Sequence, residues 1–496
     1  MRYKLVELDY YKTLNSSWGG IALKVQLSCY LSEQKSTLKK LIEILSKKYQ
    51  YVSILGCDSK GKNYSVTKGT ISVNDSNWSE RGFVLRVYNG IGYSEFSFNE
   101  LPNDNITQFA EYLTTQLDSY QTSLADSDFK KYPVLQEEMI NDNFYGEVDI
   151  LPESVTSKDI IVKLTDIMEM GSKVSEFIVD YRVRFDIVHI SKLFLSNKKE
   201  LEQAYIWSQA YLMPLSRKDQ NNKFFYKSFS GLKGIEIIDE MVPYIEEVGL
   251  ESVSMLNAVP MTPGTYDIIC SPDITGLIAH EAFGHGVEMD MFVKDRAKAV
   301  EYIEKPVASK LVTMHEGARS AHHVSSYLFD DEGVVGTDTI VIDKGILKTG
   351  ISDLLSALQL GTTPTGNGKR QSYERKAYAR MTNTVIAGGN DTLEDMIASI
   401  EHGYILLDSQ GGMEDPKNWG IQCMLLKGVE IKDGKLTDKI ISPIIMTGYV
   451  PELLSNISMV SPDISLSGSG MCGKGYKEFV KNSSGGPYIK TKARLG

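Results

Sequence analysis

The sequence contains no run of about 18 apolar residues, the length that a membrane-spanning helix requires. Its opening stretch, MRYKLVELDYYK, contains neither the apolar core nor the small-residue cleavage site of a secretory signal. We therefore expect no export signal and no membrane span, and we predict a cytoplasmic protein.

Cysteine is scarce, with five in 496 residues. The five are Cys29, Cys57, Cys270, Cys423 and Cys472, and no two of them form a CxxC pair. An odd number of scattered cysteines argues against a disulfide framework and fits reduced thiols in a cytoplasm. Most of these side chains are expected to be small buried hydrophobic groups.

Positive charge is in the minority. The chain has 53 lysines and arginines against 64 aspartates and glutamates, which gives a net charge of -11. This balance argues against nucleic acid or an anionic membrane as a general partner. Apolar residues make up 42% and charged residues 24%, as in ordinary globular proteins. The length suggests two or three domains.

The first half of the chain mixes helical and strand patterns. Residues 36–104 begin with the helical stretch STLKKLIEILSKKY and continue with β-like runs such as YVSILG and RGFVLRVYNGIGYSEFSF, separated by the turn-rich patches DSKGKN and NDSNWS. The later stretch VDYRVRFDIVHI alternates like a strand with one wet face, on which His189 is structural. We predict an N-terminal α+β region at 1–225, divisible into subdomains at about 1–104 and 105–225.

The second half is richer in glycine and in short apolar runs. In DEGVVGTDTIVIDKGILKTG and GVEIKDGKLTDKI, an Asp-Lys-Gly or Lys-Asp-Gly tip joins two β-like runs. We predict a β-rich C-terminal domain at 226–496 that includes a few helices. The predicted fold class of the whole chain is α+β.

A His-Glu motif with unusual spacing stands in LIAHEAFGHGVEMD, residues 277–290. Ser271, Pro272 and Asp273 predict the N-terminal turn of the helix that carries it. Each residue of an α-helix turns by about 100°, so two histidines four apart lie within about 40° and can share a metal. His280 and His285 are five apart, about 140°, and cannot do so on a regular α-helix.

Glycines on both sides of the second histidine suggest two solutions. Either the helix ends near Gly284 and His285 swings back, or the turn widens into a π-like bulge. A catalytic zinc also takes a third protein ligand as a rule. The candidate is Cys472 in SLSGSGMCGKGY, where a glycine-rich loop surrounds a thiol that suits such a metal. The alternative is that Cys472 is a buried filler.

Another histidine-rich stretch, HEGARSAHH at 315–323, is predicted to be a charged helix or loop that binds no metal. Glu288 and Asp290 either orient the histidines or are solvated. FDDEGV is predicted to be a turn before a strand. Arg370 and Arg380 either bind a substrate carboxylate or contact the aspartates of FDDEGV, and the sequence does not choose between these roles.

The second half of the chain resembles the TldD/PmbA family of metallopeptidases, also called modulators of DNA gyrase. The resemblance rests on ordered blocks, namely HEAFGHGVE (280–288), FDDEGV (329–334), TGNGKRQS (365–372), ARMTNT (379–384), GGMEDP (411–416) and GMCGK (470–474). The chain retains HExxxH, as the catalytic TldD-like type does. It departs from the family at Ala379 and in the tail after CGK, which puts specificity in doubt.

The resemblance implies Zn²⁺ held by His280, His285 and Cys472, with Glu281 as the catalytic carboxylate that activates a water molecule. It also implies peptide or unfolded-protein substrates, an enclosed site, and a homodimer or a heterodimer with a PmbA-like chain. Two other functions are open. The chain could be a non-enzymatic interaction or regulatory subunit of such a complex, or a cysteine hydrolase that uses Cys472 and a histidine.

Overall fold

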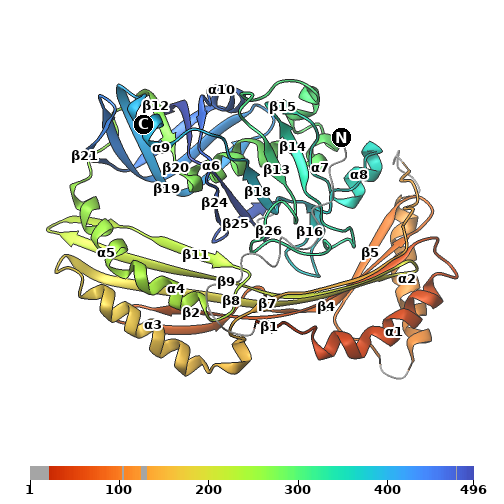
Figure 1. The fold of residues 1–496 in the computed structure, drawn as a ribbon. Helices are drawn as coiled ribbons and strands as arrows, with labels where there is room; N and C mark the ends of the chain where they lie inside the picture. The colour runs from red at the N-terminus through yellow and green to blue at the C-terminus, as the bar shows by residue number, and fades with distance from the viewer. Residues whose placement is uncertain (1–21, 103–104, 125–130, 476–477) are drawn as a thin grey trace.

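The computed structural model describes residues 22–102, 105–124, 131–475 and 478–496. The stretch for which we predicted no export signal, residues 1–12, lies outside this part. Figure 1 shows a long curved sheet at the bottom, helices beneath it, and the second half of the chain above it. None of the helices in the described part is long and apolar enough to cross a membrane.

The lower layer, which we call the floor sheet, is built from nine strands before residue 232. Its main path runs β10-β9-β8-β2-β4-β5, with β11 and β6 on β9 and β3 on β2. The bounds are β2 (Val52–Val66), β3 (Ile71–Asp75), β4 (Glu80–Tyr88), β5 (Tyr93–Phe98), β6 (Ile140–Tyr145), β8 (Ile178–Ser196), β9 (Lys199–Lys218), β10 (Asn221–Phe224) and β11 (Lys227–Gly231).

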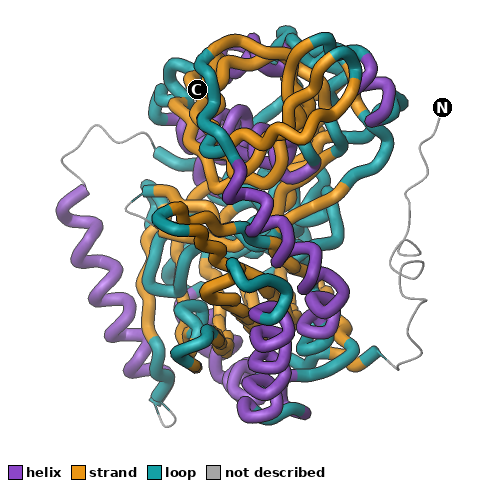
Figure 2. Tube along the Cα trace, turned by 90° about the vertical axis from the view of Figure 1, so that its left-hand side faces the viewer, coloured by secondary structure: helices purple, strands orange, loops and turns teal. Residues whose placement is uncertain are grey.

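Helices cover one face of the floor sheet because its strands alternate. In β9, Ile206, Ala210 and Leu212 face a core with α3 (Ser157–Ser172), α4 (Ile237–Met241) and α5 (Ile245–Ser254). At the other end, α1 (Cys29–Leu45) and α2 (Ile106–Leu124) pack over β4 and β5. Figure 2 shows the same order of layers from the side. The wet-faced strand that carries His189 is confirmed as β8.

One turn predicted in this half is wrong. The patch DSKGKN, residues 58–63, lies inside the continuous strand β2. Its Lys60 and Gly61 pair with His189 and Val188 of β8. These long-range backbone hydrogen bonds outweigh the local turn preference of the polar residues and glycine.

The upper layer contains two larger sheets. In the first, β12 (Gly264–Cys270) pairs with both β19 (His402–Asp415) and β28 (Ile489–Leu495), and β20 (Gly420–Lys432) and β22 (Ile444–Tyr449) complete a closed ring. The second has the order β15-β14-β13-β18-β27-β24, with bounds β13 (Met314–Glu316), β14 (Thr339–Asp343), β15 (Ile346–Leu347), β18 (Asn383–Ile386), β24 (Ser465–Ser467) and β27 (Ser483–Gly486).

The two predicted hairpin tips are confirmed. Lys344 and Gly345 join β14 to β15 with positive φ angles of 46° and 82°. Asp433 and Gly434 join β20 to β21 (Lys435–Ile441) in the same way, with 49° and 73°. Two consecutive positive φ angles define the hairpin turn that matches the twist of the strands, and glycine adopts the second at little cost.

The predicted α+β class is confirmed, with a β-rich second half. The helix or loop predicted for HEGARSAHH is wrong at its start, since His315 and Glu316 belong to β13 between β14 and β18. The boundary between the two regions at residue 225 stays a prediction. The last strand of the floor sheet, β11, ends at Gly231, and β12 begins at Gly264.

Candidate metal centre

The His-Glu motif lies on a helix that changes its winding. α6 (Pro272–Ile278) is an α-helix, the next residues form the π-helix η5 (Ala279–Gly284), and the 3-10 turn η6 (His285–Val287) follows. The π-like alternative is therefore confirmed. Ser271 precedes the helix with the backbone of a cap, but its hydroxyl makes no capping hydrogen bond.

The wider turn brings the two histidines together. The His285 amide donates to the His280 carbonyl, the i→i+5 hydrogen bond of a π-helix. The two ring centroids lie 5.3 Å apart. Gly284 has ordinary helical angles, φ -66° and ψ -56°. A Cβ there would lie 1.9 Å from the Met381 sulfur, so close packing, rather than an unusual dihedral, requires the glycine.

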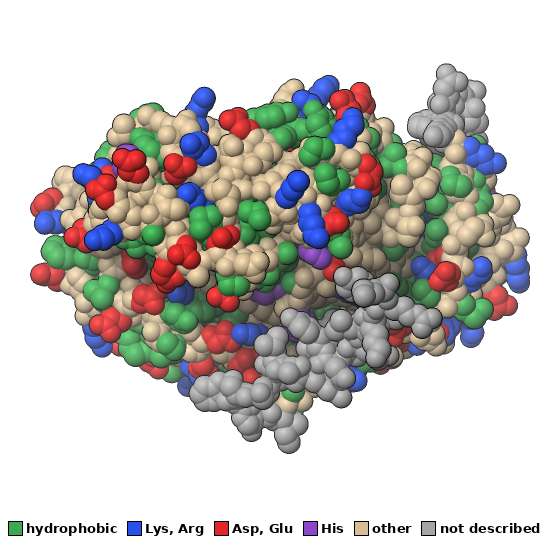
Figure 3. Space-filling view, turned by 45° about the horizontal axis from the view of Figure 1, so that its top comes forward, with side chains coloured by type: hydrophobic (Ala, Val, Ile, Leu, Met, Phe, Trp, Pro, Cys, Tyr) green, Lys and Arg blue, Asp and Glu red, His purple; other side chains and the backbone are tan. Residues whose placement is uncertain are grey.

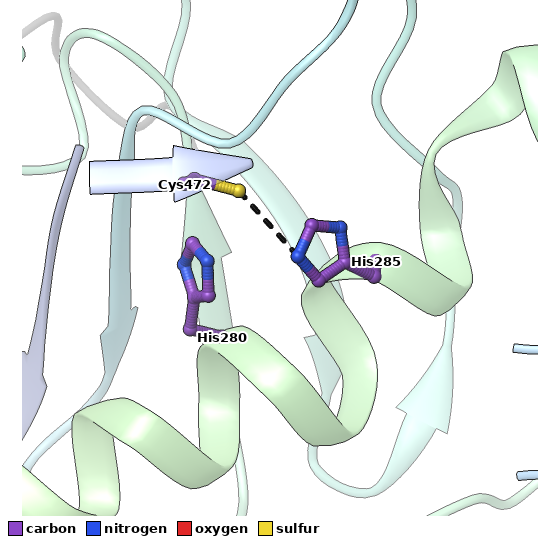
Figure 4. Close-up of side chains that lie close together, drawn as sticks. All are labelled: His280, His285 and Cys472. Atoms are coloured by element: carbon purple, nitrogen blue, oxygen red, sulfur yellow. Dashed lines mark hydrogen bonds between the residues drawn. The ribbon is translucent and has the colours of Figure 1, made fainter. Parts of the chain in front are cut away.

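The third member of the cluster arrives from a hairpin, β25 (Met471–Lys474) with β26 (Glu478–Lys481). The Cys472 Sγ lies 3.4 Å from His285 Nε2, and Figure 4 shows the thiol between the two rings. One ligand atom from each of His280, His285 and Cys472 lies within 4.8 Å of the others. In the described part of the chain, this is the one set of His, Cys and acidic side chains found close enough to share an ion.

The three groups perturb one another's protonation. Burial raises the pKa of Cys472, but the two imidazoles outweigh it and hold that pKa well below its usual range. Burial lowers the pKa of His285, but Cys472 and Glu288 raise it well above the usual value. A thiolate therefore lies among nitrogens that carry protons. Zn²⁺ replaces such protons and takes the same donors, a thiolate and two neutral imidazoles.

Glu288 orients the second histidine. His285 Nδ1–H donates to Glu288 Oε2 over 3.3 Å, which leaves Nε2 directed at the cysteine. Burial raises the pKa of Glu288, but Lys474 and His285 outweigh it and lower that pKa to about 2. Of the two acids considered in the sequence, Glu288 contacts a histidine, whereas Asp290 contacts Lys474 over 2.6 Å.

His280 is 5% exposed, and its Nδ1 lies 3.3 Å from Nδ2 of Asn482. The Oδ1 atom of Asn482 is buried without a hydrogen-bond partner among the described residues. A half-turn of this amide lets Oδ1 accept the Nδ1–H of His280 and leaves Nε2 for a metal. The donor set and this unpartnered oxygen therefore fit a bound zinc ion.

Glu281 stands beside the cluster. Its Oε2 lies 4.0 Å from His285 Nε2, and its side chain is 14% exposed. Gly412 of β19 packs against it, since a Cβ on that glycine would lie 2.9 Å from the Glu281 Cγ. The carboxylate is thus held beside the cluster without belonging to the three grouped side chains.

The two arginines have structural partners. Arg380 donates to the carbonyls of Cys472 and Glu478, and so joins the two strands of the hairpin. Arg370 donates through its guanidinium to Glu95, and its backbone amide donates to Asp331 over 2.7 Å. FDDEGV contains a turn at Gly333, with φ 74°, as predicted. These contacts favour the second role considered for Arg370, whereas the guanidinium of Arg380 lies beside Glu288, with 3.9 Å between Nε and Oε1.

Glu414 is a further buried acid near the cluster that was not predicted from the sequence. Both of its carboxylate oxygens are buried without a hydrogen-bond partner among the described residues, next to Gly286. The signal was strand alternation, because Glu414 pairs with the buried Ile421, whereas the preceding Met413 is 63% exposed. Burial raises the pKa of Glu414 well above its usual range, despite the nearby His285.

Known proteins resemble the half of the chain that carries these residues. Residues 263–493 match the family model of the PmbA/TldA metallopeptidase C-terminal domain. A metalloprotease of Methanothermobacter thermautotrophicus is 29% identical over 63% of this chain and 68% of its own length. A zinc metalloprotease TldD homolog of Saccharolobus solfataricus is 31% identical over 48% of this chain and 53% of its own length. A metalloprotease TldD homolog of Buchnera aphidicola from Schizaphis graminum is 36% identical over 42% of this chain and 44% of its own length.

In the last two comparisons the chain thus spans about half the length of the relative. The fold itself extends farther. The crystal structure of TldE from Thermococcus kodakarensis has a TM-score of 0.71 over 93% of this chain and all of its own, at 18% identity. At that identity the likeness shows the fold alone. The matched domain and the TldD relatives place residues 263–493 of this chain in the PmbA/TldD family of metallopeptidases.

Proposed function

We propose that this chain is a zinc-dependent peptidase whose metal ligands are His280, His285 and Cys472. The observation that carries the proposal is the meeting of two imidazoles and a thiolate beside a fourth group, Glu281, that is not a ligand. A relative named as a zinc metalloprotease supports the choice of metal. Three protein ligands with an open position are typical of catalytic zinc.

Bound zinc would supply a Lewis acid that polarises a peptide carbonyl and makes water easier to deprotonate. Glu281 would accept the proton of the attacking water at its carboxylate and then deliver it to the leaving amine. Glu288 would keep the Nδ1 proton on His285, and so keep Nε2 free as a donor. Arg380 would hold the carbonyl of Cys472 and thereby the strand that carries the thiolate.

The proposed substrates are small or unfolded peptides. Figure 3 shows histidine side chains at a hollow between the two halves of the molecule, and only 19% of the His285 side chain is exposed. A flexible chain enters such a recess more readily than a folded surface does. We also propose assembly as a homodimer or with a PmbA-like chain, as the likeness to TldE suggests.

A cysteine hydrolase is the second candidate, because the Cys472 Sγ lies 3.4 Å from an imidazole nitrogen, within the range of a thiolate–imidazolium pair. The two candidates respond oppositely to reagents. A metallopeptidase loses activity when a chelator removes the metal, whereas a cysteine hydrolase keeps its activity under chelation and loses it to a thiol alkylator. A purely regulatory subunit would show no hydrolysis under any of these conditions.

The first test is elemental analysis of the purified protein and of Cys472→Ala. We expect about one zinc per chain in the wild type and a loss of most of it in the variant, because a ligand is gone. Cys57→Ala, which removes a buried thiol in the floor sheet, should keep its zinc. Glu281→Gln should keep zinc but lose peptide hydrolysis. A wild type without zinc after reconstitution under reducing conditions would overturn the proposal.

A further inference from the structure

A square of polar side chains lies on the face of the floor sheet opposite the helices. It consists of Gln209 and Tyr211 of β9 and Ser228 and Ser230 of β11. Ser228 pairs with Tyr211 and Ser230 with Gln209, so the four side chains share one face. We call this group the polar square. Polar side chains between two packed layers lose hydrogen bonds to water. These four side chains therefore require hydrogen-bond partners in the upper layer.

Three partners belong to the segment just before Cys472. The Tyr211 hydroxyl donates to the Ser469 carbonyl over 2.6 Å. Ser230 Oγ accepts from the Gly468 amide, and Ser228 Oγ accepts from the Ser469 hydroxyl, each over 2.9 Å. The polar square therefore holds the chain at a point only three or four residues from the thiol.

The fourth partner comes from the other strand of the hairpin. Gln209 Oε1 accepts a hydrogen bond from the Lys481 ammonium, while Gln209 Nε2 donates to Asp186 over 2.6 Å. Lys481 pairs with Met471 in the hairpin register, and its ammonium also lies 3.4 Å from the Gly470 carbonyl. Both strands of the hairpin are thus attached to the floor sheet.

Such attachment matters because β25 and β26 form a separate two-stranded sheet. An isolated hairpin is marginally stable, and a metal ligand must be held to about 0.5 Å. Arg380 fixes this hairpin from the upper layer. We propose that the polar square is a positioning element of the metal centre, which fixes the Cys472 thiolate from the floor sheet. This inference rests on the metal site of the proposed function.

The test uses Co²⁺ in place of Zn²⁺, because thiolate-bound cobalt has a charge-transfer absorption that reports on the Cys472–metal bond. Tyr211→Phe removes one hydroxyl and keeps the ring. We expect Co²⁺ and Zn²⁺ to bind about threefold to tenfold more weakly, the range that one lost hydrogen bond gives, and the thiolate band to shift or weaken. Ser230→Ala should act in the same direction.

The matched control is Tyr226→Phe. The Tyr226 hydroxyl also donates from the N-terminal half to a carbonyl of the upper layer, but that carbonyl belongs to Ser409 of β19. This variant should leave the thiolate band and the metal affinity unchanged. The thermal melts of the metal-free proteins separate a local effect from a loss of folding, and we expect Tyr211→Phe to melt like the control.

The outcomes separate the two proposals. A wild type without a thiolate–cobalt band overturns the metal centre itself and the positioning role with it. A wild type with the band and a Tyr211→Phe variant that matches it in band and affinity overturns the positioning role alone. An equal loss in Tyr211→Phe and Tyr226→Phe also overturns it, since the effect would then belong to the contact between the two halves in general.

Discussion

Two buried polar clusters lie where the floor sheet meets the upper layer, and they differ in how their charges are satisfied. One is the metal cluster of His280, His285 and Cys472. The other, which we call the ion-pair cluster, lies toward the β4–β5 end and consists of Arg86, Glu95, Lys192, Asp331, Glu332 and Arg370.

In the ion-pair cluster the charges of opposite sign meet. Arg86 contacts Glu332 and Glu95, the latter over 2.7 Å, and Lys192 contacts Asp331. The cavity among them is about 10 Å³, the lower limit for a single water molecule. The metal cluster instead keeps donor atoms that point at one another. Buried polar groups alone therefore do not indicate a metal site. A metal site is indicated by ligand atoms that converge on one point without a side chain of opposite charge between them.

The largest effect should come from breaking the ion-pair cluster. Glu332→Gln keeps an acceptor for the Leu354 amide but leaves the buried Arg86 with one carboxylate fewer. We expect the free energy of unfolding of the metal-free protein to fall by about 3 kcal/mol. Zinc content should not change. Chemical denaturation measures the loss.

The control for this change is Glu304→Gln, which breaks the exposed ion pair with Lys348. An exposed pair contributes under about 1 kcal/mol, so this variant should be nearly as stable as the wild type. If both variants lost the same free energy of unfolding, the ion-pair cluster would not contribute more than an exposed pair. If Glu332→Gln lost zinc, the two clusters would not be independent.

A smaller effect is expected at the metal cluster. Glu288→Gln weakens the hydrogen bond that orients His285, and such partners of a ligand histidine change metal affinity by about tenfold to a hundredfold. Competition with a chelator measures the affinity. Asp290→Asn changes a side chain that contacts Lys474 and Lys294, so it should have less effect, and a loss as large as that of Glu288→Gln would contradict the orienting role.

The last effect depends on pH. Glu80 lies beside the ion-pair cluster. Burial raises the pKa of its carboxyl group to about 7, although the nearby Lys192 lowers that pKa. Its Oε2 accepts a hydrogen bond from the Tyr373 amide over 2.8 Å. The folded state holds this proton more tightly than the unfolded state, whose pKa is about 4.5. Stability is therefore lost as the pH rises from about 4.5 to about 7.

Glu80→Gln removes this loss. In metal-free protein it should be more stable than the wild type by about 1 to 3 kcal/mol above pH 7, and the two should match below about pH 4.5. Urea denaturation across this range measures the difference. An advantage that is the same at every pH would show that the carboxyl does not titrate in this way.

The sequence predicted the residues of the metal cluster better than the backbone that brings them together. His280, Glu281 and His285 stand out by spacing. Cys472, 187 residues after His285, was a candidate because of its glycine-rich loop, and the resemblance to the TldD/PmbA family favoured it. Spacing alone allowed two winding patterns for the helix. The choice depends on tertiary packing, since Met381 fills the space beside Gly284.

Other errors have the same origin. The turn predicted at residues 58–63 failed because β2 gains hydrogen bonds from β8, far along the chain. Glu414 was missed because a buried acid on a strand is recognised only once the inward face is known. Local patterns predicted the hairpin tips at Lys344 and Asp433 correctly, since those turns depend on two or three adjacent residues.

The order of the ligands along the chain has a consequence for synthesis. The floor sheet comes first, then the helix with both histidines, and the Cys472 hairpin follows almost two hundred residues later. During translation the two histidines are made long before Cys472. The sheet that contains β12 closes only after β28 has been made, because β12 pairs with β28. The proposed three-ligand site is thus complete only after residue 472 has been made, and a product truncated before this residue lacks the thiolate.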